Sequence, residues 1–274
     1  MEAFISPSPV DLLDLRDLTW SRVTGSINSD GAFLKASNTD KTLYYKMSAY
    51  NVSQGIYGHE AVNELLAYRI AKELCIPVPE TTLSKALVSI DNEDIETHIA
   101  ITKSFKRTHE TRMSFENFYK SVRYKGESAE SVAIRHGWTP LLQLMYLFDF
   151  LIINRDRHGA NLEVLDDCGK KRLSPFFDNG LSLAVSCSTA TELDAFDVMA
   201  DRQVNNFIGS RSLYENLKGI PADIQINKPG NDFRERLLEG LTGVISERHM
   251  DVIWDIFIKR WRYVSSHILD NRAK

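Results

Sequence analysis

The distribution of apolar positions predicts a helix in each of two stretches of the chain. From Gly58 to Cys75, apolar side chains recur at intervals of three and four residues, which predicts an amphipathic α-helix that Pro77 and Pro79 end. A second stretch, Leu141 to Ile153, is almost continuously apolar. With about 13 residues it is shorter than the roughly 20 that cross a bilayer, so we expect a buried helix from Pro140 to Asn154 instead.

The residues around the first of these helices favour strands. Thr42 to Met47 is rich in aromatic and β-compatible side chains, and Ser21 to Gly31 is rich in turn-forming residues between β-compatible flanks. Two further strands, Glu80 to Ile90 and Thr97 to Phe105, are predicted on either side of an acidic turn at residues 91–96. The first part of the chain is therefore expected to form a small sheet with one helix.

Beyond residue 105 the predicted elements are mainly helical. A hairpin with strands at 162–165 and 171–173, and with Asp and Gly in its turn, is expected to lead to Asp178. The segment 10–18 fits either a short helix or an edge strand, and 182–210 has no clear pattern. Further helices are predicted at Ser114–Tyr124, Ser128–His136, Asp232–Leu241 and His249–Asp270.

This order of elements predicts an α+β protein of two lobes. Residues 1–105 would form a small nucleotide-binding lobe of antiparallel strands and one helix. Residues 106–274 would form a larger, mainly helical catalytic lobe. A chain of 274 residues is long for one compact domain and is long enough for two lobes that share a cleft.

Composition and charge exclude several classes of protein. With 43% hydrophobic and 26% charged residues, 14 Gly and 8 Pro, the chain is neither disordered nor collagen-like. A net charge of -4 and a pI near 6.0 give no overall attraction to nucleic acid. Cys75, Cys168 and Cys187 are widely spaced and form no metal-binding pattern, which predicts a cytoplasmic protein without structural zinc. The first residues lack the pattern of a signal peptide.

Candidate catalytic residues follow the apolar helix. Asp156 and Asn161 are five residues apart in a polar loop, and Asp178 follows 17 residues after Asn161. Phosphoryl transfer needs carboxylate and amide oxygens for Mg²⁺ and an acceptor for the proton of the incoming hydroxyl. The loop and the Asp178 turn can supply both, whereas a polar loop that only caps the helix is the alternative.

These motifs resemble those of a known kinase family. The segment Asn154 to Asn161 is similar to the N-x-D-x-H-x-x-N catalytic loop of HipA-like bacterial serine/threonine kinases, and its D-R-H-x-x-N core is shared with phosphoinositide kinases. Phe177 to Gly180 resembles the metal-binding turn of the same group. The resemblance extends to Lys46 and Asn63-Glu64 and covers about residues 20–270 in outline. It implies a two-lobed protein-kinase-like fold.

The resemblance also implies a role for each matched residue. Asp156 would orient or deprotonate the acceptor hydroxyl, while Asn161 and Asp178 would hold Mg²⁺. Lys46 would contact the α- and β-phosphates of ATP, held by an ion pair with Glu64. His158 is expected to brace the loop by bonding to backbone near the Asp178 turn, not to act as an acid or base.

The remaining nucleotide contacts are expected from two loops. The backbone between Thr102 and Phe105, including Lys103, would meet the adenine. Residues 24–31, with Ser26, Ser29 and Gly31, would cover the phosphates, although no G-x-G-x-x-G pattern is present. Because HipA-like kinases can autophosphorylate in this loop, our hypothesis is that Ser26 or Ser29 is such a site.

The residues and the resemblance together predict an ATP- and Mg²⁺-dependent kinase that phosphorylates a protein on Ser or Thr. The resemblance also allows that it is the toxin-type kinase of a toxin–antitoxin system. A lipid or small-molecule kinase, or a nucleotide-binding pseudokinase that acts as an interaction module, are the alternatives. Larger members of the family carry an extra N-terminal segment, and the resemblance suggests an antitoxin-like or other small protein as a partner. Neither direct binding to nucleic acid nor a membrane span is expected.

Overall fold

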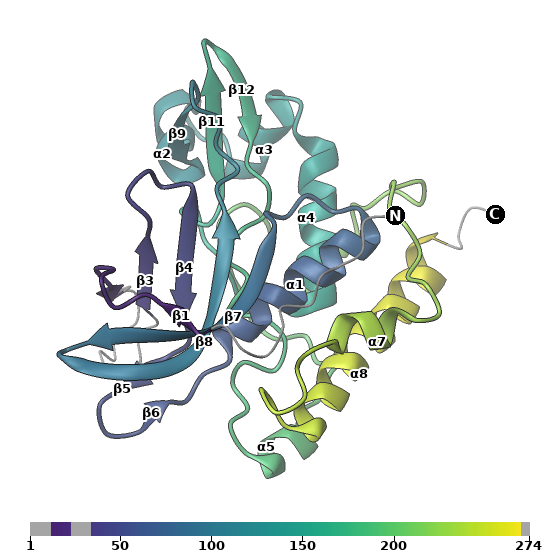
Figure 1. Ribbon diagram of the computed structural model, residues 1–274. Coiled ribbons are helices and arrows are strands. Elements are labelled where there is room, and N and C mark those ends of the chain that lie inside the picture. The colour runs from purple at the N-terminus through teal and green to yellow at the C-terminus, as the bar shows by residue number, and fades with distance from the viewer. Residues whose placement is uncertain (1–11, 23–33, 270–274) are drawn as a thin grey trace.

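A six-stranded sheet forms one side of the molecule (Figure 1). The structure is a computed structural model that describes residues 12–22 and 34–269. The strands lie in the order β1-β7-β8-β4-β3-β2, and neighbours are antiparallel except for the parallel pair β1 and β7. The described residues 12–18 of the segment 10–18 therefore contribute an edge strand and contain no helix. The bounds are β1 Leu13–Asp14, β2 Ser21–Arg22, β3 Leu34–Ser37, β4 Leu43–Met47, β7 Thr81–Ile90 and β8 Glu93–Lys103.

The hairpin between β7 and β8 is tighter than the sequence pattern predicted. Its turn consists of Asp91 and Asn92, which have φ angles of 52° and 68°, and strand pairing resumes at Ile90 and Glu93. A two-residue turn with two positive φ angles matches the twist of paired strands, and Asp and Asn tolerate that conformation. The acidic residues 93–96 therefore begin β8 and do not belong to the turn.

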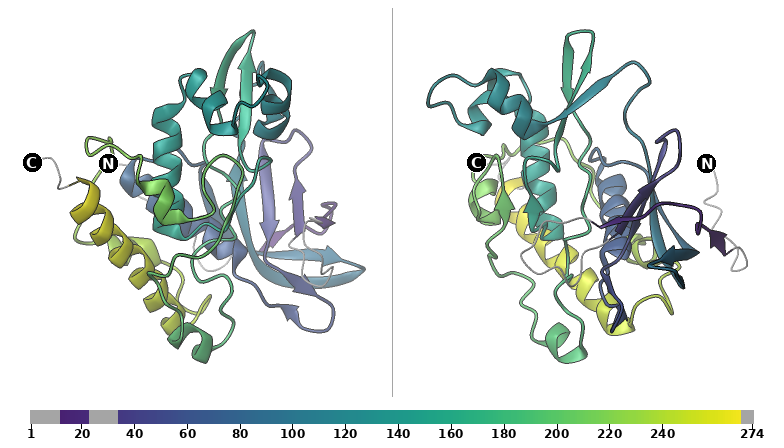
Figure 2. Two further views of the ribbon diagram at one scale, coloured as in Figure 1. Left: turned by 180° about the vertical axis from the view of Figure 1, so that it is seen from behind. Right: turned by 90° about the vertical axis from the view of Figure 1, so that its left-hand side faces the viewer.

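The helices gather on the other side of α1 from the sheet. In Figures 1 and 2, α1 lies between the large sheet and helices α4, α7 and α8. No helix of the described residues has both the length and the apolar character needed to cross a membrane. The bounds are α1 Glu60–Leu74, α2 Phe115–Val122, α3 Ala129–Arg135, α4 Thr139–Ile152, α5 Ala190–Asp194, α6 Leu213–Leu217, α7 Phe233–Leu238 and α8 Glu247–Val264, which a π-helical turn at Ser265–Leu269 extends.

A second sheet, built from strands beyond residue 105, lies at the top of Figure 1. It has the order β12-β11-β9, and its β11–β12 hairpin projects from the molecule in both views of Figure 2. The expected hairpin is present, but β9 and four very short strands were not predicted. The bounds are β5 Tyr50–Asn51, β6 Gly55–Ile56, β9 Thr111–Ser114, β10 Asp156–Arg157, β11 Glu163–Asp167, β12 Lys170–Leu173 and β13 Asn205–Asn206.

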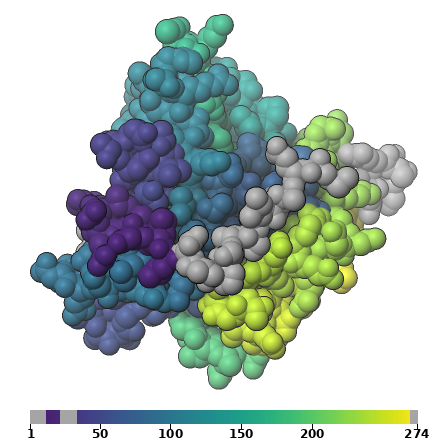
Figure 3. All heavy atoms as spheres, in the orientation of Figure 1, coloured from purple at the N-terminus to yellow at the C-terminus, as the bar shows by residue number. Residues whose placement is uncertain are grey.

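The hydrophobic side chains form two separate clusters. One lies within the large sheet, whereas the other contains the buried side chains of α1 together with those of the C-terminal helices. Figure 3 shows the N-terminal strands and the C-terminal helices on opposite sides of the molecule. The division into lobes at residues 105 and 106 stays a prediction, because α1 shares its core with the helices.

Polar contacts also attach α1 to the C-terminal half of the chain. Arg69 Nη1 donates to the carbonyl oxygens of Leu237 and Glu239 at 2.8 and 2.7 Å, and Glu73 pairs with Arg236 at 2.7 Å. At the other end of the contact, the Asn63 amide donates to two carbonyl oxygens after Asp178. The helix is therefore bound to the helical part by its apolar core and by its polar side chains.

The buried His249, at the start of α8, contacts His59, which precedes α1, and makes stability depend on pH. The rings of His59 and His249 are 4.4 Å apart, and burial, together with the nearby His59, lowers the pKa of His249 to about 4. An unfolded histidine titrates near 6.5. Between these values the unfolded chain binds a proton that the folded chain does not, so stability falls as pH falls from about 6.5 to about 4.

We expect His249→Gln to remove part of this acid sensitivity. The free energy of unfolding in urea, compared between pH 7 and pH 4.5, should fall by about 2 kcal/mol less in the variant than in the wild type. His109→Gln, at an exposed position, is the matched control. An unchanged pH dependence in His249→Gln would contradict the assignment.

Candidate active site

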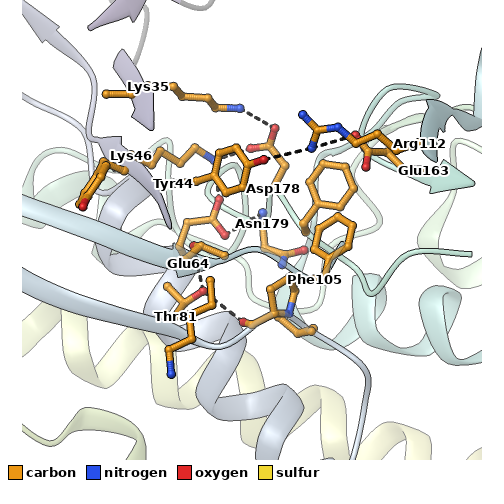
Figure 4. A pocket seen from close by; sticks show the side chains of 17 residues that line it. Lys35, Tyr44, Lys46, Glu64, Thr81, Phe105, Arg112, Glu163, Asp178 and Asn179 are labelled. Carbon is orange, nitrogen blue, oxygen red and sulfur yellow. Dashed lines mark hydrogen bonds and ion pairs between the residues drawn. The ribbon is translucent and has the colours of Figure 1, made fainter. Parts of the chain in front are cut away.

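A buried cluster of charges joins three elements beside α1. Strand β4 supplies Lys46, helix α1 supplies Glu64, and the turn after β12 supplies Asp178 (Figure 4). Lys46 Nζ donates to Glu64 Oε1 and to Asp178 Oδ1. The three side chains are at most 15% exposed, so their charges interact more strongly than they would in water.

A second lysine, which the sequence analysis missed, bonds to the same carboxylate. Lys35 lies opposite Lys46 in the β3–β4 register, and its Nζ is 2.7 Å from Asp178 Oδ2. Burial alone would raise the pKa of Asp178, but the charges of Lys46 and Lys35 outweigh it and hold the pKa well below its usual range. Despite burial, Asp178 and Glu64 raise the pKa of Lys46. Asp178 is therefore ionised and Lys46 protonated at neutral pH.

Glu64 also fixes the backbone of the Asp178 turn. Its two carboxylate oxygens accept hydrogen bonds from the amides of Asn179 and Gly180, at 3.1 and 3.0 Å. Asp178 itself has a φ of 62°, which directs its side chain back towards the lysines. A Cβ atom on Gly180 would lie 3.0 Å from Lys46 Nζ, so a larger residue would crowd the cluster.

The polar loop after α4 holds the side chain of Asp156 from two directions. Its Oδ1 accepts a hydrogen bond from Asn205 Nδ2 at 2.8 Å, and its Oδ2 is 3.6 Å from His158 Nε2. Asn161 Nδ2 donates to the Asp156 carbonyl at 2.8 Å. Asn205 lies in β13, which belongs to the segment 182–210 and pairs with β10, so no pattern in the sequence indicated this contact.

Arg157, and not His158, braces the Asp178 turn. Its guanidinium donates to the Phe177 carbonyl at 2.8 Å and to Asn179 Oδ1 at 2.9 Å, and it pairs with Asp149 at 2.7 Å. The His158 ring instead accepts from the amide of its own loop at Ala160, and no bond to the turn is found among the described residues. The isolated Asp149 within an apolar helix was the available signal, because a buried carboxylate needs a cationic partner.

Removal of Arg157 is expected to destabilise the fold. Its side chain and that of Asp149 are each 2% exposed, and loss of one partner leaves the other charge buried and unpaired. Arg157→Met should lower the free energy of unfolding by roughly 3 kcal/mol in a urea titration.

A double variant separates the ion pair from simple loss of packing. If the pair is the cause, Asp149→Leu combined with Arg157→Met should be less destabilised than the single variant. Equal destabilisation of the single and double variants would show that packing of the guanidinium dominates.

A cavity of about 170 Å³ opens beside the charge cluster. Lys46, Glu64, Lys103, Phe105 and Asp178 all line it, whereas Asp156 and Asn161 are not part of its lining. The remaining lining residues are Lys35, Ala36, Tyr44, Tyr45, Val78, Pro79, Thr81, Thr102, Arg112, Glu163, Phe177 and Asn179. The expected phosphate-covering residues Ser26, Ser29 and Gly31 lie outside the described residues.

Asn161 and Asp178 each carry an oxygen atom of a kind that a magnesium ion binds. The Asn161 amide nitrogen is used by the Asp156 carbonyl, while its Oδ1 has no hydrogen bond within the described residues. No group of three or more His, Cys, Asp or Glu side chains that could hold a metal occurs in the described part of the chain. One carboxylate and one amide oxygen fit the coordination preference of Mg²⁺, which binds few protein ligands and completes its coordination shell with phosphate oxygens and water.

Comparison with known proteins gives a family and a fold. The sequence profile described as "HipA-like C-terminal domain" matches residues 23–211, more than half of the chain. A search of curated proteins found no match. The structure of the Helicobacter pylori proinflammatory kinase CtkA is similar with a TM-score of 0.58 and 15% identity, over 95% of this chain and 96% of that one. Shewanella oneidensis MR-1 HipA, in a complex with HipB and operator DNA, has a TM-score of 0.42 and 16% identity over 91% and 67%.

Proposed function

Because the chain belongs to the HipA-like C-terminal domain family, we propose that it is a kinase that uses ATP and Mg²⁺ to phosphorylate a protein on Ser or Thr. The observation that carries this proposal is the ion-paired cluster of Lys46, Glu64 and Asp178 on the wall of a cavity. Phosphoryl transfer requires mainly that a protein positions the reacting groups and neutralises the charge of the phosphates. The fold shared with CtkA is consistent with this activity.

The cavity has separate groups for the phosphates and for the base of a nucleotide. Lys46, held by Glu64, would contact the α- and β-phosphates. Phe105 and Phe177, with ring centroids 5.3 Å apart, offer an apolar surface for the base. The Lys103 amide already donates to the Glu80 carbonyl at 3.0 Å, whereas the Phe105 amide has no partner among the described residues and would meet the base.

Asp156 would serve the acceptor side of the reaction. Asn205 holds one of its carboxylate oxygens, and the other would orient the incoming hydroxyl and accept its proton. Asn161 and Asp178 would hold Mg²⁺, which when bound neutralises the charge on the phosphates. Arg157 links the Asp156 loop to the Asp178 turn, because it lies in that loop and donates to the Phe177 carbonyl.

Transfer of labelled phosphate tests the proposal. The purified chain is incubated with γ-labelled ATP and Mg²⁺, alone and with a cell extract, and label is expected on protein as phosphoserine or phosphothreonine. Label only in the lipid or small-molecule fraction would overturn the protein substrate, and nucleotide binding without transfer would favour an interaction module. Peptide mapping of the chain itself tests Ser26 and Ser29 as autophosphorylation sites. An antitoxin-like partner and a toxin role stay predictions from the resemblance.

A further inference from the structure

Glu163 lines the cavity but has no part in the charge cluster. Its side chain is 17% exposed, and its Oε2 atom is buried without a hydrogen-bond partner in the described residues. Its Oε1 atom is 3.9 Å from Arg112 Nη1. Burial raises the pKa of Glu163, and the charge of Arg112 opposes that rise. A buried acceptor without a donor costs free energy, so this oxygen requires an explanation.

The other two carboxylates of the lining are satisfied by the protein. Glu64 accepts from Lys46 and from two backbone amides, and Asp178 accepts from two lysines. Glu163 is therefore the carboxylate of the described lining that is left to meet a ligand. The unpartnered Oε2 atom is an acceptor when it carries no proton, so a ligand group that satisfies it is a hydrogen-bond donor.

Hydrogen bonds to Ser174 hold the backbone of Glu163, and Arg112 lies beside its side chain. Its amide donates to Ser174 Oγ at 3.1 Å, and its carbonyl accepts from the Ser174 amide at 2.8 Å. Arg112 is its diagonal neighbour on β9, since Glu163 pairs with Ser114 in the antiparallel register. Arg112 Nη1 also donates to the hydroxyl of Tyr44, on the opposite sheet, at 3.2 Å. The backbone of Glu163 is therefore held in place before a ligand binds, and Arg112 is the cation that faces its carboxylate.

The position of Glu163 in the cavity indicates which part of a bound nucleotide would lie beside it. In Figure 4, Arg112 and Glu163 lie together on one side, Lys35 and Lys46 lie on the other, and Asp178 lies between them. The lysines suit the phosphates, and the paired rings of Phe105 and Phe177 suit the base. ATP offers donors at the amino group of the base and at the 2′- and 3′-hydroxyls of the ribose, and only the two hydroxyls are adjacent groups that match the two oxygens of a carboxylate.

We propose that Glu163, positioned by Arg112, accepts hydrogen bonds from the ribose hydroxyls and makes the site selective for ribonucleotides over deoxyribonucleotides. This inference rests on the proposed nucleotide-dependent function and adds the recognition of the sugar. Glu163 is then a specificity residue that touches the substrate away from the phosphates.

Calorimetric titration tests this with Mg²⁺ and three nucleotides: ATP, 2′-deoxy-ATP and 3′-deoxy-ATP. The wild-type chain should bind ATP about tenfold or more tightly than 2′-deoxy-ATP, as expected for hydrogen bonds to a charged group. Glu163→Leu should weaken ATP binding more than binding of 2′-deoxy-ATP, which has only the 3′-hydroxyl to lose, and should remove most of the difference between the two nucleotides. Glu96→Leu, at an exposed position on β8, is the matched control.

Each further outcome decides the question. Equal binding of all three nucleotides by the wild type overturns the inference without any variant, and it leaves the kinase function intact. Equal loss of ATP and 2′-deoxy-ATP binding in Glu163→Leu overturns it too, because the residue would then contact the base or support the fold. If Glu163→Leu melts at a lower temperature than the control, Glu163→Gln replaces it, with an expected intermediate selectivity. Absence of all nucleotide binding would overturn the proposed function itself.

Discussion

Asp178→Asn is expected to lower phosphate transfer by about a thousandfold or more, equivalent to roughly 4 kcal/mol of transition-state stabilisation. The exchange preserves the shape of the side chain, and Asn tolerates the positive φ of this position. It removes the charge that both Lys35 and Lys46 contact, and with it the carboxylate that would hold the metal. The loss should therefore reflect charge and not a distorted turn.

Initial rates of label transfer at saturating ATP measure this effect. Asp255→Asn, in an exposed pair with Lys259 on α8, is the matched control and should keep the wild-type rate. Thermal melting of both variants shows whether the fold is intact. A folded Asp178→Asn protein that transfers phosphate at the wild-type rate would remove Asp178 from the active site.

Asp156→Asn is expected to reduce transfer by about a thousandfold while nucleotide affinity stays unchanged. Asp156 is absent from the lining of the cavity, so the loss should appear in the chemical step and not in binding. The amide can keep the hydrogen bond to Asn205 through its oxygen, but it can no longer accept a proton.

The distinction requires two measurements on the same preparation. Calorimetric titration with ATP and Mg²⁺ should give the wild-type affinity, whereas single-turnover transfer should be slow. A parallel loss of affinity would mean that Asp156 belongs to the nucleotide site, and an unchanged rate would exclude it as the base.

The sequence was sufficient to place those candidate residues that lie in a locally recognisable pattern. Lys46 on a strand, Glu64 on an amphipathic helix and the Asp178 turn could each be assigned from periodicity and from the resemblance. The two-lobed α+β class followed from the change from strands to helices near residue 105. These assignments need only short stretches of sequence.

Contacts between distant segments could not be predicted in the same way. Lys35 bonds to a carboxylate 143 residues away, and Asn205 reaches Asp156 through a strand of two residues. Such short strands have no period to detect, and their pairing depends on how the whole chain packs. The brace was assigned to His158 for a related reason, because only the packed structure shows that Arg157 meets both Asp149 and the turn.

The position of α1 between the sheet and the C-terminal helices makes Glu64 the central member of the charge cluster. Its carboxylate holds the Asp178 turn through two backbone amides and pairs with Lys46 of the sheet. The helix packs against β4, β7 and β8 as well as against α7. A shift of α1 would therefore change the contacts of Lys46 and of the Asp178 turn at the same time.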